Sequence, residues 1–500
     1  MPRTKKTNTK VEFGDFQTPY SLACEVCHLL HRLGVSPTSI LEPTCGTGNF
    51  LIAACQYFYD AVRVLGVEIK ESRARTAQAA LSRTGFFDRA QVLQGDFFQV
   101  DWNDILRSLP DPLLLVGNPP WVTNSELGSM GGTNLPRKQN TQGLSGIQAR
   151  TGKSNFDISE WMLLHLLDLV NERDATLAML CKTAVARKVL FYGWKHGKHI
   201  ASSHIFPIDA PKHFGASVDA CLLVIRVSTA GRHFDCVVHQ GLEEGAAAGE
   251  FGYRNGELIA DVLAYERWKH LQGPERYKWR SGIKHDCAAL MELRKEGDLY
   301  RNGMGELVEI EEDCLYPMLK GSQIVKGGEM KPSKWMLVTQ HFVGEDTGGI
   351  AIQFPKTWEY LTRHSARLDR RASSIYTRQP RFSMFGVGDY AFSPWKVGVS
   401  ALHKRAEFTM IGPHAGKPVV LDDTCNFVPC RTRDEAKLVT NLLSSDVAKQ
   451  FLSAFVFWDA KRPLSIEVLR KLDLLELARE LERENDLLGY LGPMQISVFA

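Results

Sequence analysis

The chain has 500 residues, of which 44% are hydrophobic and 23% are charged, and its formal net charge is +3 at pH 7. This composition is typical of a globular protein and excludes a disordered or fibrous chain, and the length exceeds one ordinary core, so two domains are expected. The small net charge excludes a uniformly basic protein, although positive charge confined to one cleft would still allow nucleic-acid binding.

The N-terminal residues and the cysteines indicate in which compartment the protein works and whether it binds a metal. Residues 1–10 are hydrophilic and lack the apolar core of a secretory signal peptide, and no apolar run reaches the roughly 18 residues that span a bilayer. The eleven cysteines have no even spacing, which favours free thiols. Cys24, Cys27, His28 and His31 could suggest a metal site, but no second ligand pair completes it. We therefore expect a cytosolic protein with a buried helix here and no metal.

Apolar strands alternate with helical stretches over about the first 230 residues. Residues 113–116 are continuously apolar, which fits a strand buried on both faces. Further strands are expected at residues 39–41, 64–68, 90–94, 175–181 and 220–225, and helices at residues 49–59, 72–84 and 157–171. This order predicts an α/β fold with a doubly wound, Rossmann-like parallel sheet.

The remaining organisation follows from changes of pattern along the chain. Residues 123–154 form a long polar stretch, which is usually functional or disordered inside a domain. The signal weakens over residues 231–284, which we interpret as a connecting segment, and short strand-like runs then precede helices after about Arg433. We expect a first domain at residues 1–230 and a second, mixed α+β domain at residues 285–500.

A glycine-containing turn follows the first strand and includes Glu42, Gly46 and Gly48. Glycines let the backbone turn tightly and approach a ligand, although dinucleotide-binding folds use a similar turn. The Gly-Thr-Gly spacing and the acid at the strand end favour S-adenosylmethionine, because a carboxylate there can meet the ammonium group of that ligand.

Acidic residues also end the next two strands. Glu68 is placed to accept hydrogen bonds from both ribose hydroxyls, and Asp96 can accept one from the adenine amino group while Phe97 covers the ring. Each acid alone could be a helix cap or a surface charge, but consecutive strand ends furnished in this way predict a ligand site. The predicted cofactor-binding residues up to the fourth strand end are Glu42, Cys45, Gly46, Gly48, Glu68, Ile69, Asp96, Phe97 and Asn118.

The fourth strand is followed by Asn118, Pro119, Pro120 and Trp121, which are the predicted catalytic residues. The two prolines restrict the backbone and remove two N–H donors, which leaves carbonyl oxygens free to face a substrate. The Asn118 side-chain oxygen and the Pro119 carbonyl could both accept hydrogen bonds from one NH2 group and localise its lone pair. In-line attack on a sulfonium methyl then needs proximity and orientation, which supply on the order of 7–11 kcal/mol.

A target base in a duplex must leave the base stack to reach such a site, and it then needs aromatic faces on which to stack. Trp121 offers one face. Phe214, which we expect in a loop before the strand at residues 220–225, is the candidate for the second face, although it could instead be a packed core residue.

Together these residues resemble the N6-adenine DNA methyltransferases of bacterial type II restriction-modification systems. The resemblance is to the class in which cofactor motifs precede the catalytic motif and a target recognition domain is C-terminal, and it covers essentially the whole chain. Residues 13–19 resemble the N-terminal cofactor motif, which implies that Thr18 and Pro19 bind the methionine part of S-adenosylmethionine. Residues 152–158 resemble a segment whose following helix packs near the same moiety, and Trp121 stands where many members carry Tyr or Phe.

The resemblance implies site-specific methylation of adenine N6 in double-stranded DNA by base flipping, in the cytoplasm of a prokaryote. Residues 1–230 would form the catalytic domain, with Phe214 as the base-stacking aromatic, and residues 285–500 the target recognition domain. The system would be a restriction-modification or related defence system, with any restriction endonuclease encoded separately. Candidate DNA contacts, each of which could instead serve packing or solubility, are Lys320, Arg378, Arg381 and Lys396.

Three alternatives stay open. The same motif serves methylation of protein amides or RNA, but those enzymes seldom carry so large a C-terminal domain. Residues 67–70 superficially resemble a nuclease motif, but they lie inside the predicted cofactor domain. A non-catalytic DNA-recognition subunit would be free to lose Glu68, Asp96 and Asn118, which are all present.

Overall fold

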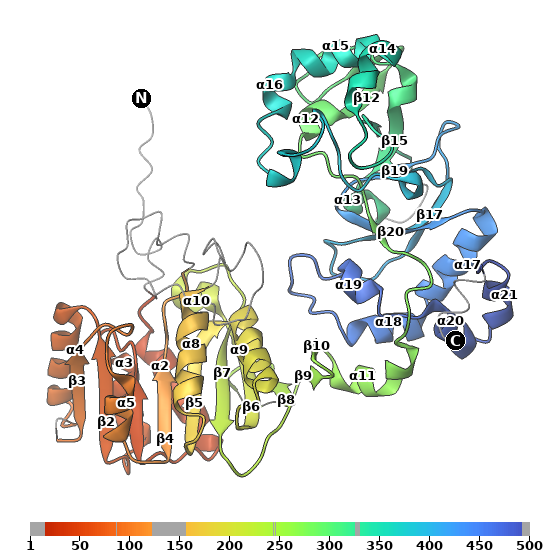
Figure 1. The fold of residues 1–500 in the computed structure, drawn as a ribbon. Helices are drawn as coiled ribbons and strands as arrows, with labels where there is room; N and C mark the ends of the chain where they lie inside the picture. The colour runs from red at the N-terminus through yellow and green to blue at the C-terminus, as the bar shows by residue number, and fades with distance from the viewer. Residues whose placement is uncertain are drawn as a thin grey trace, which may run out of the picture. The chain divides into compact units, whose positions relative to one another are not determined.

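The computed structural model describes residues 16–86, 88–122, 157–243, 245, 247–325 and 331–492. The chain divides into two compact units, residues 1–262 and 263–500, and Figure 1 shows the ribbon of both. The division falls inside residues 231–284, the segment that the sequence predicted to connect two domains.

The first unit is built on one sheet. Its strands are β1 (Ser39–Glu42), β2 (Arg63–Glu68), β3 (Ala90–Gln94), β4 (Leu113–Gly117), β5 (Ala175–Lys182), β6 (Ile200–Ile208), β7 (Ala220–Val227), β8 (Asp235–Val238), β9 (Gly249–Arg254) and β10 (Glu257–Ile259). The strand order is β10-β9-β8-β6-β7-β5-β4-β1-β2-β3. Strands β3, β2, β1, β4 and β5 pair in parallel, whereas β7 is antiparallel to both β5 and β6.

Helices precede the first strand and connect most of the strands that follow it. They are α2 (Tyr20–Arg32), α3 (Asn49–Tyr57), α4 (Glu71–Arg83), α5 (Trp102–Arg107), α8 (Ile158–Leu169), α9 (Thr183–Lys195) and α10 (Ala210–Phe214). Polar side chains fix several starts, since Asp101, Asp157 and Asp209 each accept a hydrogen bond from a backbone N–H of the helix they precede. The predicted doubly wound, Rossmann-like α/β sheet is therefore confirmed.

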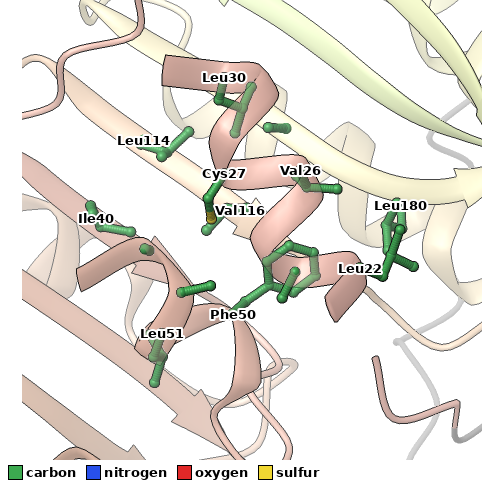
Figure 2. Close-up of a cluster of buried hydrophobic side chains, with 14 of the residues drawn as sticks. Leu22, Val26, Cys27, Leu30, Ile40, Phe50, Leu51, Leu114, Val116 and Leu180 are labelled. Carbon is green, nitrogen blue, oxygen red and sulfur yellow. The ribbon is translucent and has the colours of Figure 1, made fainter. Parts of the chain in front are cut away.

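One core cluster joins α2 and α3 to the sheet. The residues of α2 that share it recur at helical spacing, so one face of the helix is apolar. Figure 2 shows this cluster, in which Leu22, Val26, Cys27 and Leu30 come from α2 and Phe50 and Leu51 come from α3. The strands contribute Ile40 from β1, Leu114 and Val116 from β4 and Leu180 from β5.

The cysteines behave as hydrophobic residues. All eleven are free thiols, and burial raises the pKa of the Cys27 thiol well above its usual range. The helix expected around Cys24 and His31 is α2, so the prediction of a buried helix is confirmed. In the part of the chain that the structure describes, no helix has the length and apolarity needed to cross a membrane.

The structure explains why the sequence pattern for helices and strands is weak after residue 230. Strands β8, β9 and β10 extend the sheet at the edge beyond β6, and most of their residues are exposed or half-buried. An edge of this kind carries neither a continuous apolar run nor a strict alternation, which are the signals that predict strands. The predicted connecting segment is thus partly sheet and is divided between the two units.

The second unit is a mixed α+β structure, as predicted. Its sheets have the orders β11-β20-β17-β18 and β14-β13-β12-β16-β15-β19. The strands are β11 (Arg280–Ser281), β12 (Glu292–Glu296), β13 (Leu299–Arg301), β14 (Leu307–Val308), β15 (Leu315–Leu319), β16 (Lys334–Leu337), β17 (Trp395–Ser400), β18 (Thr409–Ile411), β19 (Val420–Leu421) and β20 (Cys425–Cys430).

Short helices cover the sheets of the second unit, and the helices expected after about Arg433 begin at that residue. The α-helices are α11 (Val262–Trp268), α12 (Ala288–Met291), α13 (Gly321–Ile324), α14 (Ile350–Gln353), α15 (Pro355–Arg363), α16 (Ser365–Leu368), α17 (Arg433–Leu443), α18 (Asp446–Ser453), α19 (Ile466–Leu469), α20 (Leu474–Glu480) and α21 (Glu484–Leu488). Single 3-10 turns are η1 (Lys269–Leu271), η2 (Glu312–Cys314), η3 (Thr347–Gly349), η4 (Ser374–Tyr376) and η5 (Asp389–Phe392).

Gly48 allows α3 to start where it does. The residue precedes α3 with φ +87°, and a Cβ built on it would lie 2.9 Å from the Cβ of Ala77 in α4. A side chain here would therefore meet both a strained backbone and a buried neighbour.

We predict that Gly48→Ala destabilises the first unit more than Gly34→Ala. Gly34 has φ +77°, but no heavy atom lies within 4 Å of the place that a Cβ would take, so its variant measures the backbone term alone, about 1–2 kcal/mol. Overpacking against Ala77 adds about 1–3 kcal/mol. Urea denaturation followed by circular dichroism checks this, and equal midpoints for the two variants would contradict it.

Candidate active site

A cavity of about 410 Å³ opens in the first unit, where β1, β2, β3 and β4 end. The segments that follow these strands line it, together with residues 16–18 and two residues of α8, Ile158 and Met162. Ligands in open α/β sheets bind at the carboxyl ends of the strands. The volume lies within the roughly 300–1,000 Å³ of small-molecule sites.

Most residues predicted to bind the cofactor line this one cavity. They are Thr18, Glu42, Cys45, Gly46, Glu68, Ile69, Asp96, Phe97 and Asn118. Pro19 and Gly48 are outside the lining, because Pro19 is the residue before α2 and Gly48 packs against α4. Their structural roles are to start α2 and to bring α3 close to α4.

The Glu68 carboxylate ties two of the loops together. One oxygen accepts a hydrogen bond from Gly46 N at 2.9 Å and the other accepts one from Lys70 N at 2.9 Å. Gln17 lies over the same turn, where its Oε1 accepts a hydrogen bond from Thr47 N at 3.2 Å. A side chain on Gly46 would collide with Gln17, so the glycine lets the N-terminal segment approach the turn.

Asp96 and Phe97, which follow β3, line the cavity. Asp96 accepts hydrogen bonds from Phe98 N at 3.0 Å and from Gln99 Nε2 at 2.8 Å, which orders the turn after β3. Phe97 is buried, and its ring centroid lies 4.8 Å from that of Trp102. The ring is therefore fixed before any ligand arrives.

Within the part of the chain that the structure describes, three buried oxygen atoms of the lining have no hydrogen-bond partner: Glu42 Oε2, Thr44 Oγ1 and Asn118 Oδ1. Burial raises the pKa of the Glu42 carboxyl well above its usual range, and the charge of Glu68 raises it further. Leaving a buried polar group unsatisfied costs about 1–3 kcal/mol. Three such atoms around one cavity fit a ligand that presents hydrogen-bond donors to them.

Asn118 has a fixed orientation. Its Nδ2 donates a hydrogen bond to the Phe16 carbonyl at 3.0 Å, so Oδ1 is the free end of the amide. Pro120 and Val122 line the cavity beside it. The Asn118 side chain therefore presents its oxygen, which is a hydrogen-bond acceptor, to a group inside the cavity, because its NH2 group is already used by Phe16.

The aromatic residues predicted to hold a base are in contact with each other. The centroids of Trp121 and Phe214 lie 5.1 Å apart at an interplanar angle of 72°, and Phe16 contacts both rings at 5.7 and 5.8 Å. Trp121 Nε1 also donates to the Leu180 carbonyl at 3.3 Å. Phe214 ends α10 and is not in the loop that was predicted. The edge-to-face arrangement differs from the parallel pair that would sandwich a base.

Comparison with known proteins identifies the family. No protein-family model matches the chain. A type II methyltransferase of Nostoc sp. (strain ATCC 29411 / PCC 7524), M.NspV, is 45% identical over 475 residues, which cover 94% of this chain and 98% of that protein. The chain belongs to the type II methyltransferases.

Two other similarities are more limited. A second type II methyltransferase, M.CvrRI of Paramecium bursaria Chlorella virus XZ-6E, is 38% identical over 87 residues, which cover 17% of this chain and 19% of that protein. The solved structure of the type IIL restriction-modification enzyme MmeI in complex with DNA covers 97% of this chain and 75% of its own, with 14% identity and a TM-score of 0.48.

As in other type II methyltransferases, the methyl donor is S-adenosylmethionine. The cavity fits this group, since the buried oxygens Glu42 Oε2 and Thr44 Oγ1 can accept hydrogen bonds from an ammonium group and the cavity lies where parallel strands end. Thr44 was not among the residues predicted from the sequence. It lies between Glu42 and Gly46 in the turn, and position alone did not show that its hydroxyl would be buried without a partner.

Sequence reasoning also missed a lysine of this type II methyltransferase that holds the loop after β4, which carries the predicted catalytic residues. Lys182, at the end of β5, donates from Nζ to the Trp121 carbonyl at 3.1 Å and to Asp157 Oδ2 at 2.6 Å. Ile158 N donates to the Val122 carbonyl at 2.9 Å. The end of the loop after β4, the start of α8 and the end of β5 are therefore joined at one point.

The sequence signal for this clamp was weak. Asp157 falls within residues 152–158, which were singled out by resemblance, but residues 152–156 lie outside the described part of the chain. Lys182 stands at the end of an otherwise apolar strand, where a lone cation has no partner nearby in sequence. Only the parallel pairing of β4 with β5 brings it to Trp121.

In the second unit, two of the four predicted DNA contacts form ion pairs with carboxylates of the same unit. Lys320 Nζ lies 2.5 Å from Glu292 Oε1, and Arg381 lies 2.8 Å from Asp369 Oδ2. Burial opposes the charge of Glu292, but hydrogen bonds from His285, Lys320 and Lys334 lower its pKa to about 2. Lys320 is therefore part of a buried ionic cluster.

Lys396 is a core residue and not a surface contact. Its side chain is fully buried, Nζ donates to the Ser393 carbonyl at 2.6 Å, and burial lowers its pKa to about 7. The sequence could not show this, because Lys396 follows Trp395 in a strand whose inward face is decided by the sheet. Arg378 is the one of the four that is exposed without an ion pair in the described residues.

We predict that Lys182→Met slows methyl transfer. The variant leaves the buried Asp157 carboxylate and the Trp121 carbonyl without their shared donor, which destabilises the first unit by about 1.5–3 kcal/mol and lowers turnover up to about 100-fold through displacement of the loop. Turnover at saturating cofactor, with the affinity for the cofactor from calorimetry, measures this.

The matched control is Lys188→Met, which removes an ion pair to another buried carboxylate of α8, Glu160, at 2.7 Å, and no contact with the loop after β4 among those that the described residues make. It should lose stability and keep its turnover. Equal loss of turnover in both variants would show that stability, and not loop position, explains the effect.

Proposed function

We propose that the chain is a site-specific DNA methyltransferase that acts on the N6 amino group of adenine in double-stranded DNA, within a restriction-modification or related defence system. The observation that carries the proposal is the state of Asn118. Its Nδ2 is held by the Phe16 carbonyl, and its Oδ1 is buried and unpaired at the cavity.

The chemistry follows from what such an acceptor does to an exocyclic amine. The lone pair of that amine is delocalised into the base and is a poor nucleophile. Hydrogen bonds from both N–H groups to Asn118 Oδ1 and to the Pro119 carbonyl favour a tetrahedral nitrogen with a localised lone pair. S-adenosylmethionine supplies an electrophilic methyl group: an N–C bond forms as an S–C bond breaks, and the nitrogen then loses one proton.

The aromatic cluster bears on how the base enters. Phe16, Trp121 and Phe214 touch one another in this structure, so a flipped base could stack on Trp121 or Phe214 only if the rings separate. Trp121 is tied to the sheet through Leu180, whereas Phe214 ends a helix of five residues. Movement of Phe214 and Phe16 away from Trp121 is therefore the proposed route for the base.

DNA and its defence context are supported by the extent of the similarity. The alignment with the Nostoc protein covers 94% of this chain, so it includes most of the second unit as well as the first. A separate unit with two sheets suits target recognition. The proposal therefore takes residues 1–230 as the catalytic domain and residues 285–500 as the target recognition domain.

We predict that Asn118→Ala lowers methyl transfer roughly 10²–10³-fold, the usual effect of removing one preorganised polar group from an active site. Tritium transfer from labelled S-adenosylmethionine to unmethylated genomic DNA, followed by digestion and nucleoside chromatography, measures the rate and identifies the modified base. Asn103→Ala, an exposed asparagine of the same unit, is the matched control and should keep full activity.

Two outcomes count against the proposal. Undiminished transfer by Asn118→Ala would reject the mechanism. Label on cytosine N4 would reject the adenine assignment while leaving amine methylation in place.

We also predict that cofactor binding is coupled to a proton at Glu42. Because the pKa of Glu42 is raised, the ligand-free carboxyl binds a proton at pH values above the ordinary 4.5. A cationic ammonium group favours the carboxylate, so binding releases the proton, and affinity should rise with pH until the raised pKa is passed.

Calorimetry in buffers of different ionisation enthalpy measures the released proton. Glu42→Gln should abolish both the proton release and the pH dependence, and the exposed control Glu25→Gln should change neither. A pH-independent affinity in the unmodified protein would contradict the assignment of Glu42 to the ammonium group.

A further inference from the structure

The second unit contains an open cavity of about 640 Å³ that the proposed methyl-transfer site does not use. Residues 286–289, in and before α12, form one wall, and residues 366–372, in and after α16, form the other. Four of the lining residues are alanines. Their short side chains leave the longer arginine side chains as the groups that a ligand would meet.

Three arginines line this cavity: Arg367, Arg370 and Arg371. Arg367 and Arg370 are exposed. Arg367 has only soft neighbours, with one N–H group 3.3 Å from the Met304 sulfur, and no carboxylate pairs with either residue within the described part of the chain. Their charges therefore face solvent.

Arg371 is held in place by the backbone. Its guanidinium donates to the carbonyls of Leu368 at 2.9 Å and Ser383 at 2.7 Å, and it lies 3.7 Å from the centroid of the Tyr376 ring. These hydrogen-bond partners are neutral and fix the position of the cation, and the carboxylate of Asp286 is close enough to stabilise its charge in part. Part of the cavity is thus a preorganised cationic wall.

Acidic groups offset little of this charge. Asp286 is the one carboxylate of the lining, and Lys284 Nζ lies 3.5 Å from it. The cations that the sequence favoured as DNA contacts behave differently, since Lys320 and Arg381 are paired with Glu292 and Asp369. The arginine cavity therefore groups three arginines against one carboxylate, Asp286, which interacts with Arg371.

We propose that the arginine cavity binds phosphate groups of a DNA backbone and so positions the duplex on the second unit. The inference rests on the proposed function, which supplies DNA as the partner. A guanidinium presents N–H groups in a planar fork that matches phosphate oxygens. Contacts of this kind fix the register of a protein on a duplex without reading its sequence, so they are independent of which site is methylated.

Non-specific binding tests the proposal directly, because it depends on phosphate contacts and needs no knowledge of the recognition sequence. Anisotropy of a labelled, random-sequence duplex is measured with the full-length protein across a salt series. Each lost phosphate contact lowers the slope of log affinity against log salt by about 1, so Arg367→Ala/Arg370→Ala should lower it by about 2 and weaken binding at every salt concentration.

The matched control is Arg363→Ala/Arg405→Ala, which removes the same charge from the same unit. Both residues are exposed, and they pair with Glu359 at 2.6 Å and Glu407 at 3.9 Å. The control should keep the slope of the unmodified protein. Equal slopes for the two double variants would overturn the proposal, and calorimetric binding of S-adenosylmethionine with a melting curve verifies that each variant is folded.

Two further outcomes separate the sources of failure. If the unmodified protein binds no duplex at low salt, the proposed function fails along with this inference. If it binds duplex but the arginine variant has an unchanged slope, only the inference fails. The last experiment compares the melting temperature in inorganic phosphate with that in chloride at equal ionic strength. If phosphate raises the melting temperature only when Arg367 and Arg370 are present, while their loss leaves duplex binding unchanged, the cavity binds small anions and the proposal is overturned.

Discussion

The two backbone hydrogen bonds accepted by Glu68 are the contacts on which the cofactor cavity depends. Parallel pairing sets Glu42 opposite Gly66, so the loops after β1 and β2 leave the sheet side by side and need something to fix their separation. A buried carboxylate that accepts from Gly46 and Lys70 does this. With that frame fixed, Glu42 Oε2 and Asn118 Oδ1 have no hydrogen-bond partner among the described residues and remain available to a ligand.

The two units use buried charge in opposite ways. In the first unit, hydrogen-bond acceptors around the cavity are left without partners among the described residues. This lowers the stability of the unit but keeps the acceptors available for a ligand. In the second, Glu292 is surrounded by His285, Lys320 and Lys334, so its charge contributes to the internal structure of the unit. The presence of a lysine or arginine in a recognition unit is therefore a poor guide to function unless its carboxylate partners are known.

The sequence predicted the features that depend on local order along the chain. Strand periodicity, the position of an acid after each strand and the Asn-Pro-Pro-Trp segment together located the cavity, because parallel strands bring their carboxyl ends to one edge. It could not predict features that depend on which side chains meet in three dimensions. The contact of Trp121 with Phe214, the burial of Lys396 and the junction at Lys182 all result from sheet register, which residue type does not determine.

The junction at Lys182 has a consequence for how the chain tolerates change. Val122 and Ile158 are hydrogen-bonded to each other, so the two points of the described chain that flank residues 123–156 lie close together. Loop-closure entropy grows slowly with length, by about 0.6 kcal/mol per doubling. A change in the length of chain between these two points should therefore cost the fold little, because the contacts of Lys182 with Trp121 and Asp157 do not depend on that length.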